Sequence, residues 1–120
     1  QTPLVSNAVN EQDQELIDRA TAIIRKYFDD IDFDMNVLAS ELGIGRSKLY
    51  LRIKEITGLT PNELTLKIKL EEAMYLLNNQ PNLNISEISY QLGFSSPRYF
   101  SKCFKSFYGV SPQNCRKGVN

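Results

Sequence analysis

A repeated unit of two short helices constrains the fold of this 120-residue chain more than any other feature of its sequence. Residues 38–61 recur as residues 88–112, with an offset of 50 positions before the turn and 51 after it. The matching positions include Leu42-Gly43 with Leu92-Gly93, Leu49 and Ile53 with Phe100 and Phe104, and Gly58-Leu59-Thr60-Pro61 with Gly109-Val110-Ser111-Pro112. Two matched copies in one order indicate an internal duplication of one structural unit.

The second copy has clear signals for where its two helices begin and end. Asn84 and the glutamate three residues later form a capping arrangement, and apolar residues then recur at helical spacing until Gly93 ends the helix. Ser95 or Ser96 can cap the next helix. Its first residue would be Pro97, because the first N–H of a helix has no partner inside the helix.

The helix that starts at Pro97 has an apolar side and a basic side. At about 100° per residue, Phe100, Phe104 and Phe107 fall on the apolar side, and we expect them to lie in the core with Phe94. The other side carries Pro97, Arg98, Ser101, Lys102 and Lys105. A short helix, a turn with a glycine and a second helix with a basic face form the layout of a helix-turn-helix, which places its second helix in the DNA major groove. An ordinary helical hairpin with solvated lysines has the same spacing.

The first copy repeats this layout with a less polar outer face. A helix over residues 46–57 would bury Leu49, Ile53 and Ile56 and expose a second set. That exposed set is Arg46, Ser47, Tyr50, Leu51 and Lys54. Tyr50 and Leu51 are unusual on an exposed face, so they require either a binding partner or contact with the helix that links the two copies.

The remaining apolar spacing predicts further helices at 10–30, at 35–42 after an Asp34 cap, at 61–79 and from Pro112 onward. We divide the chain into a first helix-turn-helix subdomain, a linking helix and a second subdomain, with a linker before them and a tail after them. The first subdomain covers residues 10–60, the linking helix 61–79 and the second subdomain 80–118. The linker covers residues 1–9 and the tail 119–120. Two basic-faced helices joined by one long helix fit two successive major grooves, about 34 Å apart.

Composition and charge narrow the possible functions. The chain has no histidine and two cysteines, which excludes a standard four-ligand zinc site, and we find no nucleophile with a base, phosphate loop or cofactor motif. We therefore expect no catalysis, no metal and no cofactor. Residues 1–41 hold nine acidic and three basic side chains (−6), whereas residues 42–120 hold five acidic and eleven basic ones (+6). This asymmetry favours a partner that is anionic.

The cellular location follows from what the sequence lacks. No run approaches the length of a membrane helix and no leader resembles a signal peptide, so we expect a cytoplasmic protein that makes no membrane contact through this domain. The sequence starts at Gln1 without an initiator methionine, and we expect it to be part of a longer protein.

Residues 10–118 resemble the DNA-binding domain of the AraC/XylS family of bacterial transcription regulators. The second copy carries the family's strongest pattern, and its matching residues are Ile85, Ile88, Ser89, Gly93, Phe94, Tyr99, Phe100, Lys102, Phe104, Lys105, Gly109, Ser111 and Pro112. In the first copy, Gly45-Arg46-Ser47-Lys48-Leu49-Tyr50 is most similar to the C-terminal domains of hybrid two-component regulators. In those regulators, sensor, kinase, receiver and DNA-binding domain share one polypeptide.

The resemblance implies an all-α fold of seven helices that form two helix-turn-helix subdomains joined by a long central helix. It also implies sequence-specific binding of double-stranded DNA at directly repeated promoter sites, usually by a dimeric full-length protein. Activation of transcription, contact with RNA polymerase and a place at the cytoplasmic end of a membrane-anchored sensor belong to the same expectation. A helical protein-interaction module with a basic face is the competing interpretation.

The base-contacting positions of the family carry over onto Ser47, Tyr50, Leu51, Pro97, Arg98, Ser101 and Lys102. Three residues depart from the family's usual choice. Gly45 replaces a serine cap, Cys115 replaces a tyrosine, and Leu51 replaces an arginine, so a contact by Leu51 would favour a thymine methyl over guanine.

Basic residues on the two outer faces can have either of two roles. An arginine early on a groove-inserted helix reaches guanine O6 and N7, which makes Arg98 a candidate for base contact, with a phosphate contact as the alternative. We assign five further cations of the two helices to DNA phosphates, and they are Arg46, Lys48, Arg52, Lys54 and Lys105.

Overall fold

The computed structural model describes residues 10–118, and over this range the chain is all-helical, with seven α-helices and no strand. This confirms the predicted fold class, while the predicted linker and tail lie outside the described residues. The helices form two compact units. The described part of the first unit comprises residues 10–27 and 32–68, and that of the second comprises residues 28–31 and 69–118.

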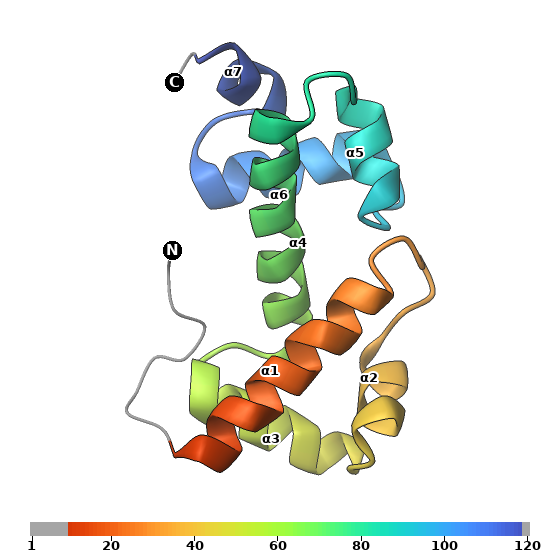
Figure 1. Ribbon diagram of the computed structural model, residues 1–120, viewed down its shortest axis with the longest axis vertical. Coiled ribbons are helices and arrows are strands. Elements are labelled where there is room, and N and C mark those ends of the chain that lie inside the picture. Colours follow the sequence, from red (N-terminus) through yellow and green to blue (C-terminus); the bar gives the residue numbers. More distant parts are fainter. Residues whose placement is uncertain (1–9, 119–120) are drawn as a thin grey trace. The chain divides into compact units, whose positions relative to one another are not determined.

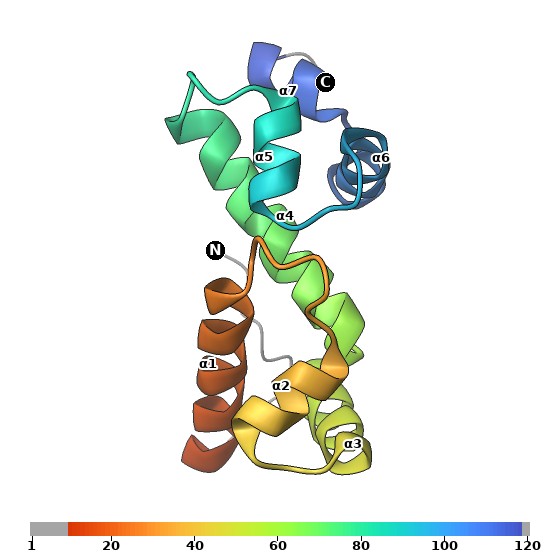
Figure 2. The ribbon, with the colours of Figure 1, turned by 90° about the vertical axis from the view of Figure 1, so that its right-hand side faces the viewer.

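The first unit consists of three helices and the start of a fourth. They are α1 (Glu11–Lys26), α2 (Met35–Leu42), α3 (Arg46–Thr57) and α4 (Pro61–Asn79), as Figure 1 shows. Helix α2 packs against both α1 and α3 (Figure 2). The apolar side chains between them are buried, and they include Ile17, Ala20, Ile24, Leu38, Leu42, Leu49, Ile53 and Leu64. The apolar spacing in the sequence therefore identified the core of this unit correctly.

Helix α1 ends earlier than its apolar spacing predicts. The pattern predicts helix as far as Asp30, but the helix stops at Lys26. At this end the Tyr27 hydroxyl donates to the Glu41 carboxylate at 2.8 Å, and the Tyr27 ring stacks on Phe33 with centroids 5.2 Å apart. These contacts hold Tyr27 at the turn, so the apolar residues beyond it follow a non-helical path.

Helix α4 begins with a capping box formed by Thr60 and Glu63. The Thr60 backbone N–H donates to the Glu63 carboxylate at 2.8 Å, and the Glu63 N–H donates to the Thr60 hydroxyl at 3.1 Å. The hydrogen bond from the Thr60 backbone lowers the pKa of Glu63. The helix belongs to the first unit up to Ile68 and to the second from Lys69. Its buried side chains include Leu64 and Ile68 in the first unit, and Leu70, Ala73 and Leu77 in the second.

The second unit contains the rest of α4 and three further helices. They are α5 (Ile85–Gln91), α6 (Pro97–Tyr108) and α7 (Pro112–Lys117). Helix α5 starts with a complete capping box in which Asn84 and Glu87 exchange hydrogen bonds of 2.8 and 2.9 Å. Of the two serines that could cap α6, the structure selects Ser96, whose hydroxyl accepts the Tyr99 N–H at 3.1 Å.

Aromatic rings form the core of the second unit, but Phe107 is not among them. Phe100 and Phe104 are fully buried, with ring centroids 5.9 Å apart. At the last turn of α6, Tyr108 takes the inward position: its ring lies 4.7 Å from Phe104 and its hydroxyl donates to the Leu70 carbonyl at 3.1 Å. Phe107 lies edge-on to Tyr108 and is 46% exposed. The prediction that Phe107 is a core residue was therefore wrong.

Arg116 links helix α7 to the end of α4 and the loop that follows it. The Arg116 guanidinium donates to the carbonyls of Leu77 at 3.4 Å and Gln80 at 3.2 Å, and also to the carbonyl of Leu83. Three carbonyls from the end of α4 and the following loop are thus satisfied by one side chain. Cys115 lies beside Met74 with their sulfur atoms 3.6 Å apart, and both Cys103 and Cys115 are free thiols.

The turn between α5 and α6 allows a very close approach of two backbone segments. Gly93 adopts a φ of +75°, and a Cβ atom there would collide with the backbone carbonyl oxygen of Phe28. Beside this point the Lys69 ammonium lies over the Phe94 ring, 5.6 Å from its centroid, and burial lowers the pKa of Lys69. Residues 28–31 are therefore packed into the second unit at this turn.

None of the helices within residues 10–118 is both long enough and apolar enough to cross a membrane.

Candidate nucleic-acid interface

The outer face of α3 carries exposed side chains, as the sequence predicts. Leu49 and Ile53 point inward and are fully buried, which fixes the rotation of the helix about its axis. On the opposite side Ser47 is exposed, Tyr50 is 41% exposed and Leu51 is 63% exposed. These fractions leave part of Tyr50 and most of Leu51 open to a binding partner.

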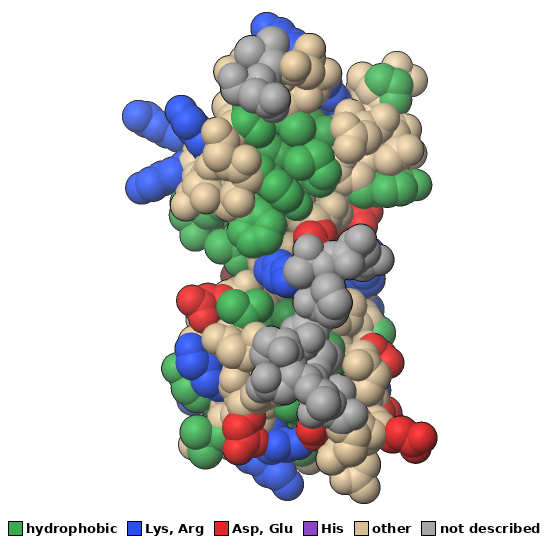
Figure 3. All heavy atoms as spheres, turned by 90° about the vertical axis from the view of Figure 1, so that its left-hand side faces the viewer, with side chains coloured by type: hydrophobic (Ala, Val, Ile, Leu, Met, Phe, Trp, Pro, Cys, Tyr) green, Lys and Arg blue, Asp and Glu red, His purple; other side chains and the backbone are tan. Residues whose placement is uncertain are grey.

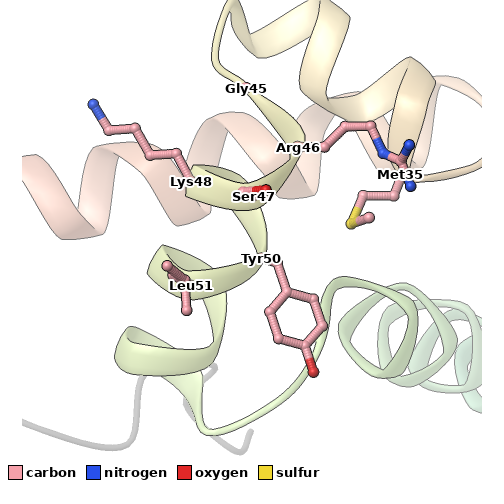
Figure 4. Close-up of a pocket in the computed structure, with 7 residues that line it drawn as sticks. All are labelled: Met35, Gly45, Arg46, Ser47, Lys48, Tyr50 and Leu51. Atoms are coloured by element: carbon pink, nitrogen blue, oxygen red, sulfur yellow. The ribbon is translucent and has the colours of Figure 1, made fainter.

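A solvent-open hollow of about 810 Å³ runs along this face of α3. Its lining comprises Met35, Gly45, Arg46, Ser47, Lys48, Tyr50 and Leu51 (Figure 4). In the close-up, Arg46 reaches toward Met35, while Lys48 points away in the opposite direction. The structure thus brings together all three residues of the first copy predicted to contact bases and two of the four predicted to contact phosphates.

Met35 is a member of this surface that the sequence did not reveal. It comes from the first turn of α2 rather than from α3, and it is only half-buried. Its spacing from Leu38 and Leu42 is that of a core residue, so no sequence pattern distinguishes it. Its role depends on how α2 and α3 cross, which only the structure gives.

Arg52 is engaged within the first unit. Its guanidinium pairs with Glu55 at 2.5 Å and also with Asp13 of α1. The hydrogen bond to Glu55 raises the pKa of Arg52. Its predicted contact with a DNA phosphate would require it to exchange these carboxylates for the phosphate. Neither Arg52 nor Lys54 lines the hollow.

The outer face of α6 is dominated by cations. Phe100 and Phe104 are buried on the inner side, and Arg98, Lys102 and Lys105 are exposed on the outer side. Within residues 10–118 no carboxylate forms an ion pair with these three side chains. Figure 3 shows Lys and Arg side chains projecting into solvent from the unit that contains α5, α6 and α7. This face can therefore accept an anionic partner without first breaking internal ion pairs.

Pro97 and Ser101 share this face but are half-buried. Pro97 is the first residue of α6, next to the Ser96 cap, so it lies at the end of the helix that would enter a groove first. The five residues of the second copy predicted to contact DNA, namely Pro97, Arg98, Ser101, Lys102 and Lys105, thus lie on one helix.

The part of the chain that the structure describes contains no group of cysteine, aspartate and glutamate side chains arranged to hold a metal ion. The chemistry available on the two faces is hydrogen bonding, charge and apolar contact.

The sequence of the chain matches the family model described as a helix-turn-helix domain over residues 38–118. It is 39% identical over 104 residues to histidine kinase P4 of Formosa agariphila, a match that covers 87% of this chain and 8% of that protein. It is 40% identical over 85 residues to the Msm operon regulatory protein of Streptococcus mutans, covering 71% of this chain and 30% of that protein. The chain thus spans a minor part of both relatives.

A solved structure with the same fold supports these matches. The C-terminal domain of AraT, a response regulator from Geobacillus stearothermophilus, aligns with a TM-score of 0.77 at 33% identity, covering 86% of this chain and 84% of that one. The chain therefore belongs to the AraC/XylS-type helix-turn-helix family. This is a family of DNA-binding domains of transcription regulators, not of enzymes. The expected likeness to two-component regulators is confirmed by the kinase and the response regulator.

Proposed function

We propose that this domain binds double-stranded DNA sequence-specifically by placing α3 and α6 in successive major grooves. In this proposal residues 10–60 and 80–118 form the two DNA-binding subdomains, and residues 61–79 form the helix that links them. The observation that supports it best is shared by the two units: each buries the inner face of its second helix and leaves the outer face exposed. Helices with buried outer faces could not enter a groove.

Base recognition is assigned to the exposed faces of the two helices. Ser47, Tyr50 and Leu51 would contact bases from α3, and Pro97, Arg98, Ser101 and Lys102 would do so from α6. Arg98 is the strongest candidate, because a guanidinium near the start of the inserted helix can donate two hydrogen bonds to guanine O6 and N7.

Phosphate contacts would hold each helix at its correct depth in the groove. We assign them to Arg46, Lys48, Lys54 and Lys105, and to Arg52 once it has left its carboxylate partners. In the first unit, Arg46 and Lys48 are the best candidates for phosphate contact, because they flank the hollow and no acidic side chain lines it.

The larger protein would act as a transcription activator. We propose that it binds directly repeated promoter sites as a dimer, contacts RNA polymerase and carries this domain at the cytoplasmic end of a membrane-anchored sensor. The likeness to a histidine kinase and to a response regulator supports such a signalling context.

Selection of binders from a random duplex pool tests the proposal. The 120-residue chain should enrich one sequence with two conserved segments, and it should bind that duplex 10³-fold or more tightly than random DNA, the lower end of the usual range for specific binding. A pool without enrichment would contradict sequence-specific binding. That result would favour the competing interpretation, a helical protein-interaction module.

A further inference from the structure

The two candidate DNA-binding faces differ in chemistry at matching positions. With the offset of 51 residues, Tyr50 and Leu51 on α3 correspond to Ser101 and Lys102 on α6. A phenol and an isobutyl group in the first unit thus replace a hydroxyl and an ammonium group in the second. The two faces therefore offer different hydrogen-bonding and apolar groups to a base-pair edge.

The apolar groups of the α3 face are large and open to solvent. Leu51 is 63% exposed and Tyr50 is 41% exposed, and Met35 adds a thioether from α2 (Figure 4). Within residues 10–118 no hydrogen bond involves the Tyr50 side chain. Exposed apolar groups gathered on one surface indicate a binding site for an apolar group.

Cations flank this apolar centre. Arg46 and Lys48 lie among the residues that line the hollow, and no aspartate or glutamate lines it. The matching ligand is therefore anionic at its edges and carries an apolar group between them. In the DNA major groove the phosphates supply the negative charge, and the C5-methyl group of thymine is the apolar group that base pairs present there.

We propose that the first unit recognises thymine C5-methyl groups in the hollow on α3, with Leu51, Tyr50 and Met35 as the contacting side chains. This inference rests on the proposed DNA binding and adds the base that the first unit selects. Met35 acts from outside the recognition helix, as a wall of the hollow. The first half of the DNA site is then rich in A·T pairs, whereas α6 selects guanine through Arg98.

Replacing thymine by deoxyuridine tests the proposal, because the exchange removes the methyl group and leaves the base-pairing edge unchanged. The probe is the duplex enriched from the random pool, with each thymine replaced in turn. At thymines contacted by the first unit, we expect about fourfold weaker binding for each lost methyl group, the usual effect of one buried methylene. The same replacement in the segment bound by α6 should change affinity less than twofold.

Three variants assign the effect to the hollow. Leu51→Ala and Met35→Ala should bring the thymine-to-uracil affinity ratio close to one at the affected positions. Lys48→Ala is the matched control from the same surface. It should weaken binding to both duplexes equally and keep the ratio near four, because a phosphate contact does not depend on the methyl group.

The outcomes separate this proposal from the proposed function. If the wild-type chain binds its selected duplex tightly but every uracil duplex equally well, DNA binding stands and methyl recognition is wrong. The proposal is also overturned if the thymine-to-uracil affinity ratio stays near four in both Leu51→Ala and Met35→Ala, provided that circular dichroism shows both variants folded. If no duplex is enriched, the proposed function itself fails.

Discussion

Arg98 is the second residue of α6, exposed and without an ion-pair partner among residues 10–118. If it contacts a guanine, Arg98→Ala should weaken binding by about 1–3 kcal/mol and relax selectivity at a single base pair. Affinities for the selected duplex and all its single-base variants measure this effect. Lys105→Ala is the control, since loss of a phosphate contact weakens binding to all these duplexes by the same factor. An equal loss on every duplex for Arg98→Ala would make Arg98 a phosphate contact.

Gly93 allows a second prediction about a single residue. Gly93→Ala and Gly109→Ala both place a Cβ on a backbone with positive φ, +75° and +78°, but only Gly93 faces the Phe28 carbonyl. We expect Gly109→Ala to lower the free energy of unfolding by about 1–2 kcal/mol, and Gly93→Ala to lower it by about 1–3 kcal/mol more. Urea denaturation of the two variants measures the difference. Equal losses would contradict the close approach of Phe28 to this turn.

Individual side chains also show where sequence patterns are insufficient. Helical spacing predicts burial of Phe107, but Tyr108 takes the inward position because its hydroxyl has a carbonyl partner. Likewise, Arg52 is assigned to a DNA phosphate from the sequence, and its pairing with Asp13 of α1 has no signal there. Both outcomes depend on neighbours distant in the sequence, which the local pattern does not contain.

At the scale of the elements, local signals were sufficient for most helix boundaries. Caps and C-terminal glycines placed the starts and ends of most helices correctly, because each signal satisfies backbone groups within a few residues. The end of α1 was the exception. Its apolar pattern continues beyond Lys26, but the chain leaves the helix there, where Tyr27 contacts Glu41 and Phe33. A pattern of apolar residues cannot distinguish helix from packed turn there.

The N-termini of α3 and α6 differ in their caps, and this difference predicts opposite effects of two substitutions on stability. Ser96 caps α6 with its hydroxyl, whereas Gly45 leaves α3 without a side-chain cap and has open space where a Cβ would be. Gly45→Ser should therefore raise the free energy of unfolding by a few tenths of a kcal/mol, and Ser96→Ala should lower it by about 1 kcal/mol. Thermal unfolding of both variants measures these opposite shifts. A loss of stability in Gly45→Ser would show that the start of α3 is not limited by its missing cap.

At the scale of the whole molecule, the distribution of charge matters more than the net charge. The formal net charge is zero, yet the cations assigned to DNA lie after residue 41 while most carboxylates precede it. If six to eight cations contact phosphates, log K should fall against log salt concentration with a slope of about −5 to −7. Titrations of the selected duplex at several salt concentrations measure the slope. A slope near zero would be incompatible with binding through these cations.

Missing-base interference on the selected duplex tests the central claim most directly, because it reports which bases the domain needs without assuming the residues involved. Two helices in successive major grooves predict two clusters of essential bases on one face of the duplex, with centres about 10–10.5 base pairs apart. Leu51→Ala should weaken one cluster and Arg98→Ala the other. A single cluster that both variants weaken alike would contradict the proposal that each unit places its own helix in a groove.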